Sequence, residues 1–134
     1  MVRYNHVGNL GMIAAMAVAL HSGPAESQDA ARGRELARSS EQGNCTICHV
    51  IPGMGLPEDA MGNLGPPLVG VGARLSAQAL TAQLTDPQAL VPDSIMPAFG
   101  KVKGLTDVAP GYRGRPILSA DEIADVVAFL KTLE

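Results

Sequence analysis

Residues 45–49 read CTICH, a pattern in which two cysteines three positions apart are followed at once by a histidine. On a helical turn, Cys45 and Cys48 can reach the two vinyl groups at one edge of a porphyrin. His49 then lies where its imidazole can bind the iron. The pattern therefore predicts one covalently attached haem c, with Cys45 and Cys48 as thioether links and His49 as one axial ligand.

Other uses of two neighbouring cysteines fit the sequence less well. A structural zinc site needs four ligands, but Cys45, Cys48 and His49 are the only Cys or His residues after position 25. A thioredoxin-like redox pair needs a βαβ context, whereas this motif lies in glycine-rich sequence with no preceding strand pattern. A disulfide between the two cysteines would leave the adjacent histidine unexplained, so haem attachment is the favoured interpretation.

The beginning of the chain is typical of a secretory signal. Arg3 and His6 precede an apolar run at residues 10–20, which is too short to span a bilayer, and small residues follow it. We expect cleavage after Ala25, which gives a signal peptide at residues 1–25 and one domain at residues 26–134. The mature protein is then expected in the periplasm and free of the membrane. Free thiols rarely persist in such an oxidising compartment, which also favours haem attachment.

The composition fits one small soluble domain. The chain has 134 residues and a formal net charge of −3, so it lacks the basic surface expected of a nucleic-acid-binding protein. Two Phe, two Tyr and no Trp leave few large side chains for a core of this size. A porphyrin would supply a large apolar body for small side chains to pack against, although a small, loosely packed core explains the composition equally well.

Three main helices are predicted, and long loops join them. The first covers residues 29–42. The second follows Ser76 as its N-cap and ends at a proline, after which an irregular loop covers residues 87–118. The third begins with a capping box formed by Ser119 and Glu122 and carries an apolar face. Since no alternating strand pattern of useful length occurs, the expected fold is all-α.

The second axial ligand must be a methionine, because no further His or Cys follows position 25. Met54 has too little chain between it and His49 to pass round the porphyrin edge. Met61 has enough chain to reach, so this geometric argument leaves it open. Met96 is the favoured ligand because Pro97 biases it towards an extended backbone and its loop is remote from His49.

The segment GPPL, residues 65–68, is predicted to fix the orientation of the His49 ring. An imidazole bound to a metal usually donates its other N–H to a carbonyl that fixes the ring orientation. The carbonyl of Pro66 is our candidate acceptor for His49. The alternative is a tight proline-rich turn that makes no contact with the histidine.

A basic run lies in the loop before the last predicted helix. It contains Lys101, Lys103, Arg113 and Arg115, with Asp107 as its only acid. Such a run is either a solvated loop or a patch that attracts an acidic partner.

Longer segments resemble a known family. CTICH, GPPL and MPAFG (96–100) resemble the haem-attachment, proline-loop and methionine-loop segments of class I cytochromes c. This resemblance implies a class I cytochrome c fold around one haem, ligation of iron by His49 and Met96, and the Pro66 carbonyl on His49. The sequence also resembles SoxX, the monohaem subunit of the SoxAX cytochromes of bacterial sulfur oxidation. The segments that carry this second resemblance are GNCTICHVIPG (43–53), GNLGPPLVGVGARL (62–75), IMPAFG (95–100) and YRGRPILSADEIADVVAFL (112–130).

The SoxX resemblance covers residues 43–133 and implies two partners, a SoxA-like cytochrome subunit and a downstream electron-acceptor cytochrome. The implied complex is an L-cysteine S-thiosulfotransferase, which joins thiosulfate to a carrier-protein cysteine and releases two electrons. Bond making is attributed to the partner, so this chain is expected to transfer electrons and not to catalyse by itself. A free-standing electron-shuttle cytochrome is the alternative, and a haem sensor from which Met96 dissociates is a third interpretation.

Overall fold

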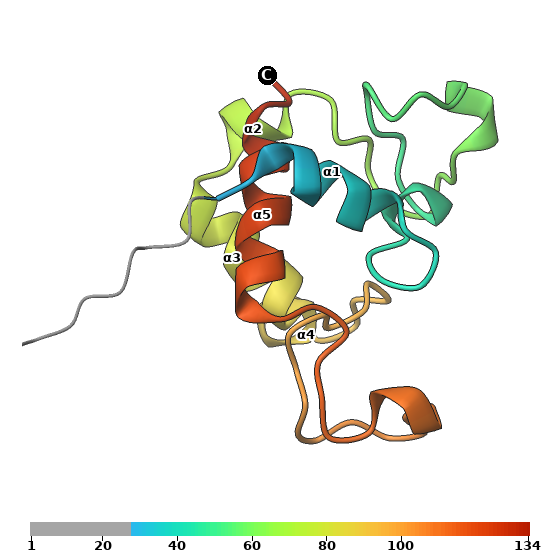
Figure 1. Cartoon of the computed structure of the whole chain (residues 1–134), viewed down its shortest axis with the longest axis vertical. Helices are drawn as coiled ribbons and strands as arrows, with labels where there is room; N and C mark the ends of the chain where they lie inside the picture. The colour runs from blue at the N-terminus through green and yellow to red at the C-terminus, as the bar shows by residue number, and fades with distance from the viewer. Residues whose placement is uncertain (1–27) are drawn as a thin grey trace, which may run out of the picture.

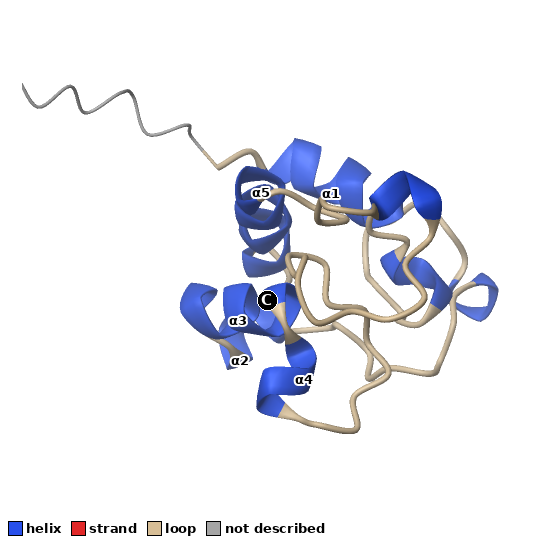
Figure 2. Cartoon of the chain, turned by 90° about the horizontal axis from the view of Figure 1, so that it is seen from below, coloured by secondary structure: helices blue, strands red, loops and turns tan. Residues whose placement is uncertain are grey.

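The computed structural model describes residues 28–134 as helices joined by long loops, and no strand occurs in that range (Figure 2). The all-α prediction is therefore confirmed, whereas the predicted signal peptide lies outside the described residues. The α-helices are α1 (Ala30–Arg38), α2 (Val71–Arg74), α3 (Ala77–Thr85), α4 (Pro87–Leu90) and α5 (Ala120–Lys131). Single turns of 3-10 helix form η1 (Cys45–Ile47), η2 (Glu58–Ala60) and η3 (Pro110–Tyr112). None of the helices between residues 28 and 134 has the length and apolarity needed to cross a membrane.

The starts of the two long predicted helices are confirmed by their caps. The Ser76 hydroxyl accepts the backbone N–H of Ala79 at 3.1 Å at the start of α3. At the start of α5, Ser119 and Glu122 form the complete capping box: each side chain accepts the backbone N–H of the other residue, at 3.2 and 2.8 Å. Both helices therefore begin where the sequence places a side chain that satisfies their free N–H groups.

The structure corrects the predicted end of the first helix and the predicted start of the long loop. The first helix ends at Arg38 and not at residue 42, because Ser39 takes an extended backbone with ψ 122° and the chain turns back towards α1. Serine competes for backbone hydrogen bonds and is a weak helix former, which explains the earlier end. The loop predicted for residues 87–118 begins with α4, because Pro87 ends α3 and then occupies the first turn of α4. The short helix α2 was not predicted either.

Helices α1 and α5 cross in contact near the middle of the fold (Figure 1). Gly33 of α1 makes this approach possible, since a Cβ at this position would lie only 2.8 Å from the backbone nitrogen of Val126 on α5. The buried apolar side chains around the crossing include Leu36, Ile123 and Leu130. Close contact between the two helices joins the beginning and the end of the described chain.

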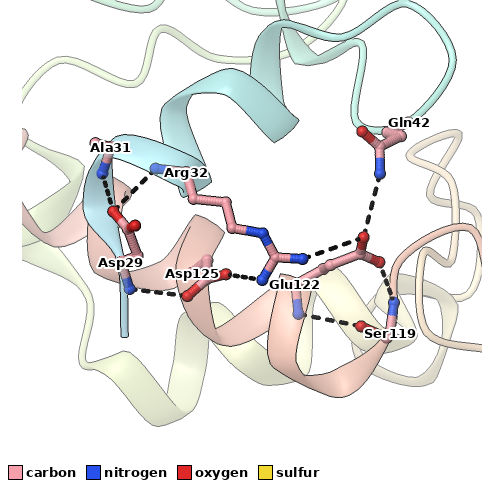
Figure 3. A network of polar contacts seen from close by, with 7 residues as sticks. All are labelled: Asp29, Ala31, Arg32, Gln42, Ser119, Glu122 and Asp125. Carbon is pink, nitrogen blue, oxygen red and sulfur yellow. Dashed lines mark hydrogen bonds and ion pairs between the residues drawn. The ribbon is translucent and has the colours of Figure 1, made fainter. Parts of the chain in front are cut away.

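A polar network fastens the same two helices at their edge (Figure 3). The buried Asp125 of α5 accepts the backbone N–H of Asp29 at 2.8 Å and pairs with Arg32 of α1 at 2.6 Å. Glu122 lies 3.7 Å from Arg32 and accepts a hydrogen bond from Gln42 at 3.2 Å. Because Gln42 lies just before the CTICH segment, the network also attaches the chain that leads into this segment to α5.

Candidate haem site

The cysteine and histidine residues of CTICH lie on and just after the turn η1. Asn44 enters the turn with a left-handed backbone, φ 47°, and the backbone N–H groups of Cys48 and His49 both bond to the Cys45 carbonyl, at 3.2 and 3.0 Å. This turn brings both sulfurs and the imidazole into one short segment. Neither cysteine forms a disulfide within the described residues.

The local environment makes Cys45 a neutral thiol. Burial raises the pKa of the Cys45 thiol to about 11, and the nearby Cys48 adds to the increase, while a backbone hydrogen bond opposes it. A redox nucleophile must be a thiolate, and burial disfavours that charged form at Cys45. Within residues 28–134, moreover, no group of three or more His, Cys, Asp or Glu side chains is placed to hold a metal ion.

The structure brings His49 and Pro66 together. The Nδ1 atom of His49 lies 2.7 Å from the Pro66 carbonyl oxygen. A carbonyl can only accept a hydrogen bond, so Nδ1 must carry the proton. In the neutral imidazole, the other ring nitrogen, Nε2, then keeps its lone pair. This tautomer is the one that a metal-bound histidine needs when Nε2 is the ligand atom.

Glycines allow the segment around Pro66 to lie directly on the histidine turn. A Cβ at Gly65 would fall 2.6 Å from His49 Nδ1, and a Cβ at Gly62 would fall 2.9 Å from the Cys48 nitrogen. The two segments also share backbone hydrogen bonds, among them Gly62 N–H to the Thr46 carbonyl and Gly65 N–H to the Cys48 carbonyl, both 2.8 Å. Backbone contacts therefore fix the histidine side of the site.

The three methionines of residues 28–134 have different surroundings. Met54 is fully buried in the core. The sulfur of Met61 accepts the backbone N–H of Ile51 at 3.3 Å, on the segment that follows His49. The sulfur of Met96 lies 3.6 Å from the Gln83 amide nitrogen, and the Met96 side chain is half-buried. These surroundings favour Met96 over Met61, the candidate that chain length alone left open.

Exposed apolar side chains cluster along the segments that carry the candidate ligands. They are Ile47, Leu64, Val69, Leu90, Val91 and Ile95. Ile95 is the most exposed of these, at 78 %, although it precedes Met96 directly. A flat apolar group held between these segments would bury such side chains, so the donor set and its surroundings fit a porphyrin.

The basic run is partly used to hold its own loop. Lys101 pairs with Asp86 at 2.7 Å, so its charge is compensated. Arg113 donates to the Val108 carbonyl at 3.3 Å. Arg115 lies over the ring of Tyr112, 5.1 Å from the centroid. Lys103 is exposed and remains the clearest candidate for contact with a partner.

Two glutamines beside Met96 were not anticipated from the sequence. Gln83 of α3 approaches the Met96 sulfur, and Gln88 of α4 donates hydrogen bonds to the Ser94 and Met96 carbonyls. Neither residue stands in a motif with Met96. Their only local signal is their position on the helices next to the methionine loop, and the side-chain directions depend on how that loop folds back.

The comparisons with known proteins agree with this arrangement. The family model for cytochrome c matches residues 30–134. A search of the curated proteins found no match. Among solved structures, a chain in the crystal structure of SoxXA from P. pantotrophus is similar, with 32 % sequence identity and a TM-score of 0.68, over 89 % of each chain.

The family match spans the CTICH turn, the methionine loop and all five α-helices. It confirms the class I cytochrome c fold and the single covalently bound haem c that the cysteine pattern predicts. The chain belongs to the cytochrome c family and is a SoxX-like electron-transfer cytochrome.

Proposed function

We propose that this chain is the monohaem electron-transfer subunit of a SoxAX-type L-cysteine S-thiosulfotransferase, which acts in thiosulfate oxidation in the periplasm. The likeness to a chain of SoxXA, 32 % identical over 89 % of this chain, supports the proposal. The proposed partners are a SoxA-like cytochrome subunit and a downstream cytochrome that accepts the electrons. The signal-like residues 1–25 support export.

Cys45 and Cys48 would hold the haem through thioether bonds, and His49 and Met96 would bind its iron. The observation that carries this assignment is the 2.7 Å contact between His49 Nδ1 and the Pro66 carbonyl. It leaves Nε2 as the free nitrogen of a histidine that directly follows the two cysteines. Metal-bound histidines usually donate their other ring N–H to such a carbonyl, which fixes the orientation of the ring.

When bound, the haem supplies an iron that takes up and releases one electron. His49 offers a nitrogen and Met96 a neutral, soft thioether, a pair that favours the ferrous state and raises the reduction potential. With His49 and Met96 both bound to the iron, no coordination position would remain for a substrate. Once the haem covers them, the apolar side chains around the site would exclude water, which would also favour a high potential. The chain is therefore suited to outer-sphere electron transfer, and bond making falls to the partner.

A partner can approach the haem-attachment turn closely. Ile47 lies between the two cysteines and its side chain is 62 % exposed, so this side of the turn is open to a partner. Close approach is what electron transfer between two proteins requires, because the haem edge must come near the partner's redox centre. The downstream cytochrome then needs only a short-lived contact with this chain to receive the electron.

The test uses the full chain, expressed with haem-maturation machinery and a SoxA-type cytochrome. We expect a periplasmic protein whose mass equals residues 26–134 plus one haem, and which co-purifies with the larger cytochrome. Thiosulfate and the carrier protein should then reduce its haem. A monomer that exchanges electrons without any partner would replace this function by that of a free-standing shuttle. A colourless protein with its two thiols bridged would refute haem attachment.

A further inference from the structure

The side chain of Gln88, on the short helix α4, donates hydrogen bonds to the loop of residues 92–98, which carries Met96. Its Nε2 atom donates to the Ser94 carbonyl at 2.8 Å and to the Met96 carbonyl at 2.7 Å. One amide group therefore uses both of its hydrogens on two carbonyls of the same loop. The side chain is half-buried, so water does not compete freely for either hydrogen bond.

The loop has few other attachments to the helices beside it. Among the described hydrogen bonds, those joining residues 92–98 to α3 and α4 come from Gln83 and Gln88 alone. Pro97 has no N–H to offer, and the next backbone attachment is Phe99 N–H to the Leu84 carbonyl at 3.0 Å. The Gln83 contact, at 3.6 Å to a sulfur, is the weaker of the two.

The exposed fractions show which residues of the loop face solvent and which face the core. Ile95 is 78 % exposed, whereas Met96 packs against the buried core. Gln88 holds the carbonyls of Ser94 and Met96, and the Ser94 hydroxyl accepts the backbone N–H of Met96 at 3.3 Å. These contacts hold the backbone from which the Met96 side chain projects.

We propose that Gln88 is the positioning residue for Met96, and that its two hydrogen bonds set how rarely the methionine leaves the iron. This inference rests on the proposed function, in which Met96 is an axial ligand. No bond to the porphyrin changes in the process: the thioether leaves one coordination position, and an added ligand occupies it. The apparent affinity for such a ligand is proportional to the fraction of molecules in which the position is open.

The test measures imidazole binding to the ferric, haem-loaded protein by visible absorption. Loss of two hydrogen bonds between neutral groups should raise the open fraction, and with it the imidazole affinity, by about tenfold. We expect this in Gln88→Ala and in Gln88→Glu, which keeps the volume but loses both donors. The thioether-to-iron charge-transfer band should weaken in parallel. Gln78→Ala, the same change at an exposed position of α3, is the matched control and should bind imidazole as the wild type does.

Two further results separate this proposal from the one on which it rests. Met96→Ala should bind imidazole far more tightly than any Gln88 variant. If it does, and both Gln88 variants retain wild-type affinity and the full charge-transfer band, the positioning role is wrong while the ligand assignment stands. If Met96→Ala retains wild-type imidazole affinity, Met96 is not the ligand, and both the ligand assignment and the positioning role of Gln88 are wrong. Thermal unfolding of each variant shows that an increase in affinity does not come from global loss of structure.

Discussion

Gly65→Ala is the substitution that probes the histidine side of the site most directly. The added Cβ would lie 2.6 Å from His49 Nδ1 and 2.8 Å from Nε2, well inside van der Waals contact. The ring cannot give way without losing its 2.7 Å hydrogen bond to Pro66. Overpacking costs about 1–3 kcal/mol and a lost hydrogen bond about 1 kcal/mol, so the free energy of unfolding should fall by about 2–4 kcal/mol. For a domain of this size, Tm should drop by at least about 8 °C.

The assay is thermal unfolding of the haem-loaded protein, followed by far-UV circular dichroism and by haem absorbance. Gly111→Ala is the matched control, because a Cβ there meets nothing within 4 Å. Both substitutions restrict the unfolded chain equally, so the difference between them isolates the clash with His49. A Gly65→Ala protein with the Tm of the control and an unchanged haem spectrum would refute the close packing of Gly65 on the imidazole.

Three other substitutions test separate parts of the structure. Gly33→Ala should force α1 and α5 apart and lower the free energy of unfolding by about 1–3 kcal/mol in urea titrations; an unchanged midpoint would contradict the crossing. Met61→Leu should keep the visible spectrum of the haem while losing about 1 kcal/mol of stability, because the Met61 sulfur accepts the Ile51 N–H; altered axial ligation would contradict the choice of methionine. Lys103→Glu should slow association with an acidic partner at low salt and have little effect at high salt, as stopped-flow mixing would measure; equal rates at low salt would leave the basic run a solvated loop.

Short-range sequence signals were enough to predict where the main helices begin. The capping box at Ser119 and the N-cap at Ser76 depend on residues only three positions apart, so both could be predicted without knowledge of the tertiary structure. The end of α1 at Arg38 was missed because the helix propensity of the following residues is only slightly unfavourable, and the turn after it is stabilised by contacts with other segments. Short helices such as α4 leave too weak a pattern to be read from sequence.

The sequence predicted the parts of the site that depend on spacing along the chain. It did not predict the parts that depend on contacts formed when distant segments fold together. The three reactive residues of CTICH follow from their separation along the chain. The role of the Met61 sulfur could not be inferred, since it depends on a backbone N–H ten residues earlier that no pattern marks. The same is true of Gln88, whose amide meets two carbonyls only after the loop has folded back on α4. Side-chain amides bond to many kinds of group, so their sequence position says little about their partners.

The two sides of the site are held by different kinds of contact, and this difference decides which side yields first. Backbone hydrogen bonds and glycine contacts hold His49, while side-chain amides hold the Met96 loop. Segments with exposed surface and few attachments open at a lower free-energy cost than the rest of a protein. Partial opening would therefore release the methionine while the histidine and the thioether links remain. Because the thioether is the ligand that favours ferrous iron, such opening would lower the reduction potential before the fold is lost. The hydrogen bonds of Gln88 thus maintain the reduction potential of the haem more than they stabilise the fold.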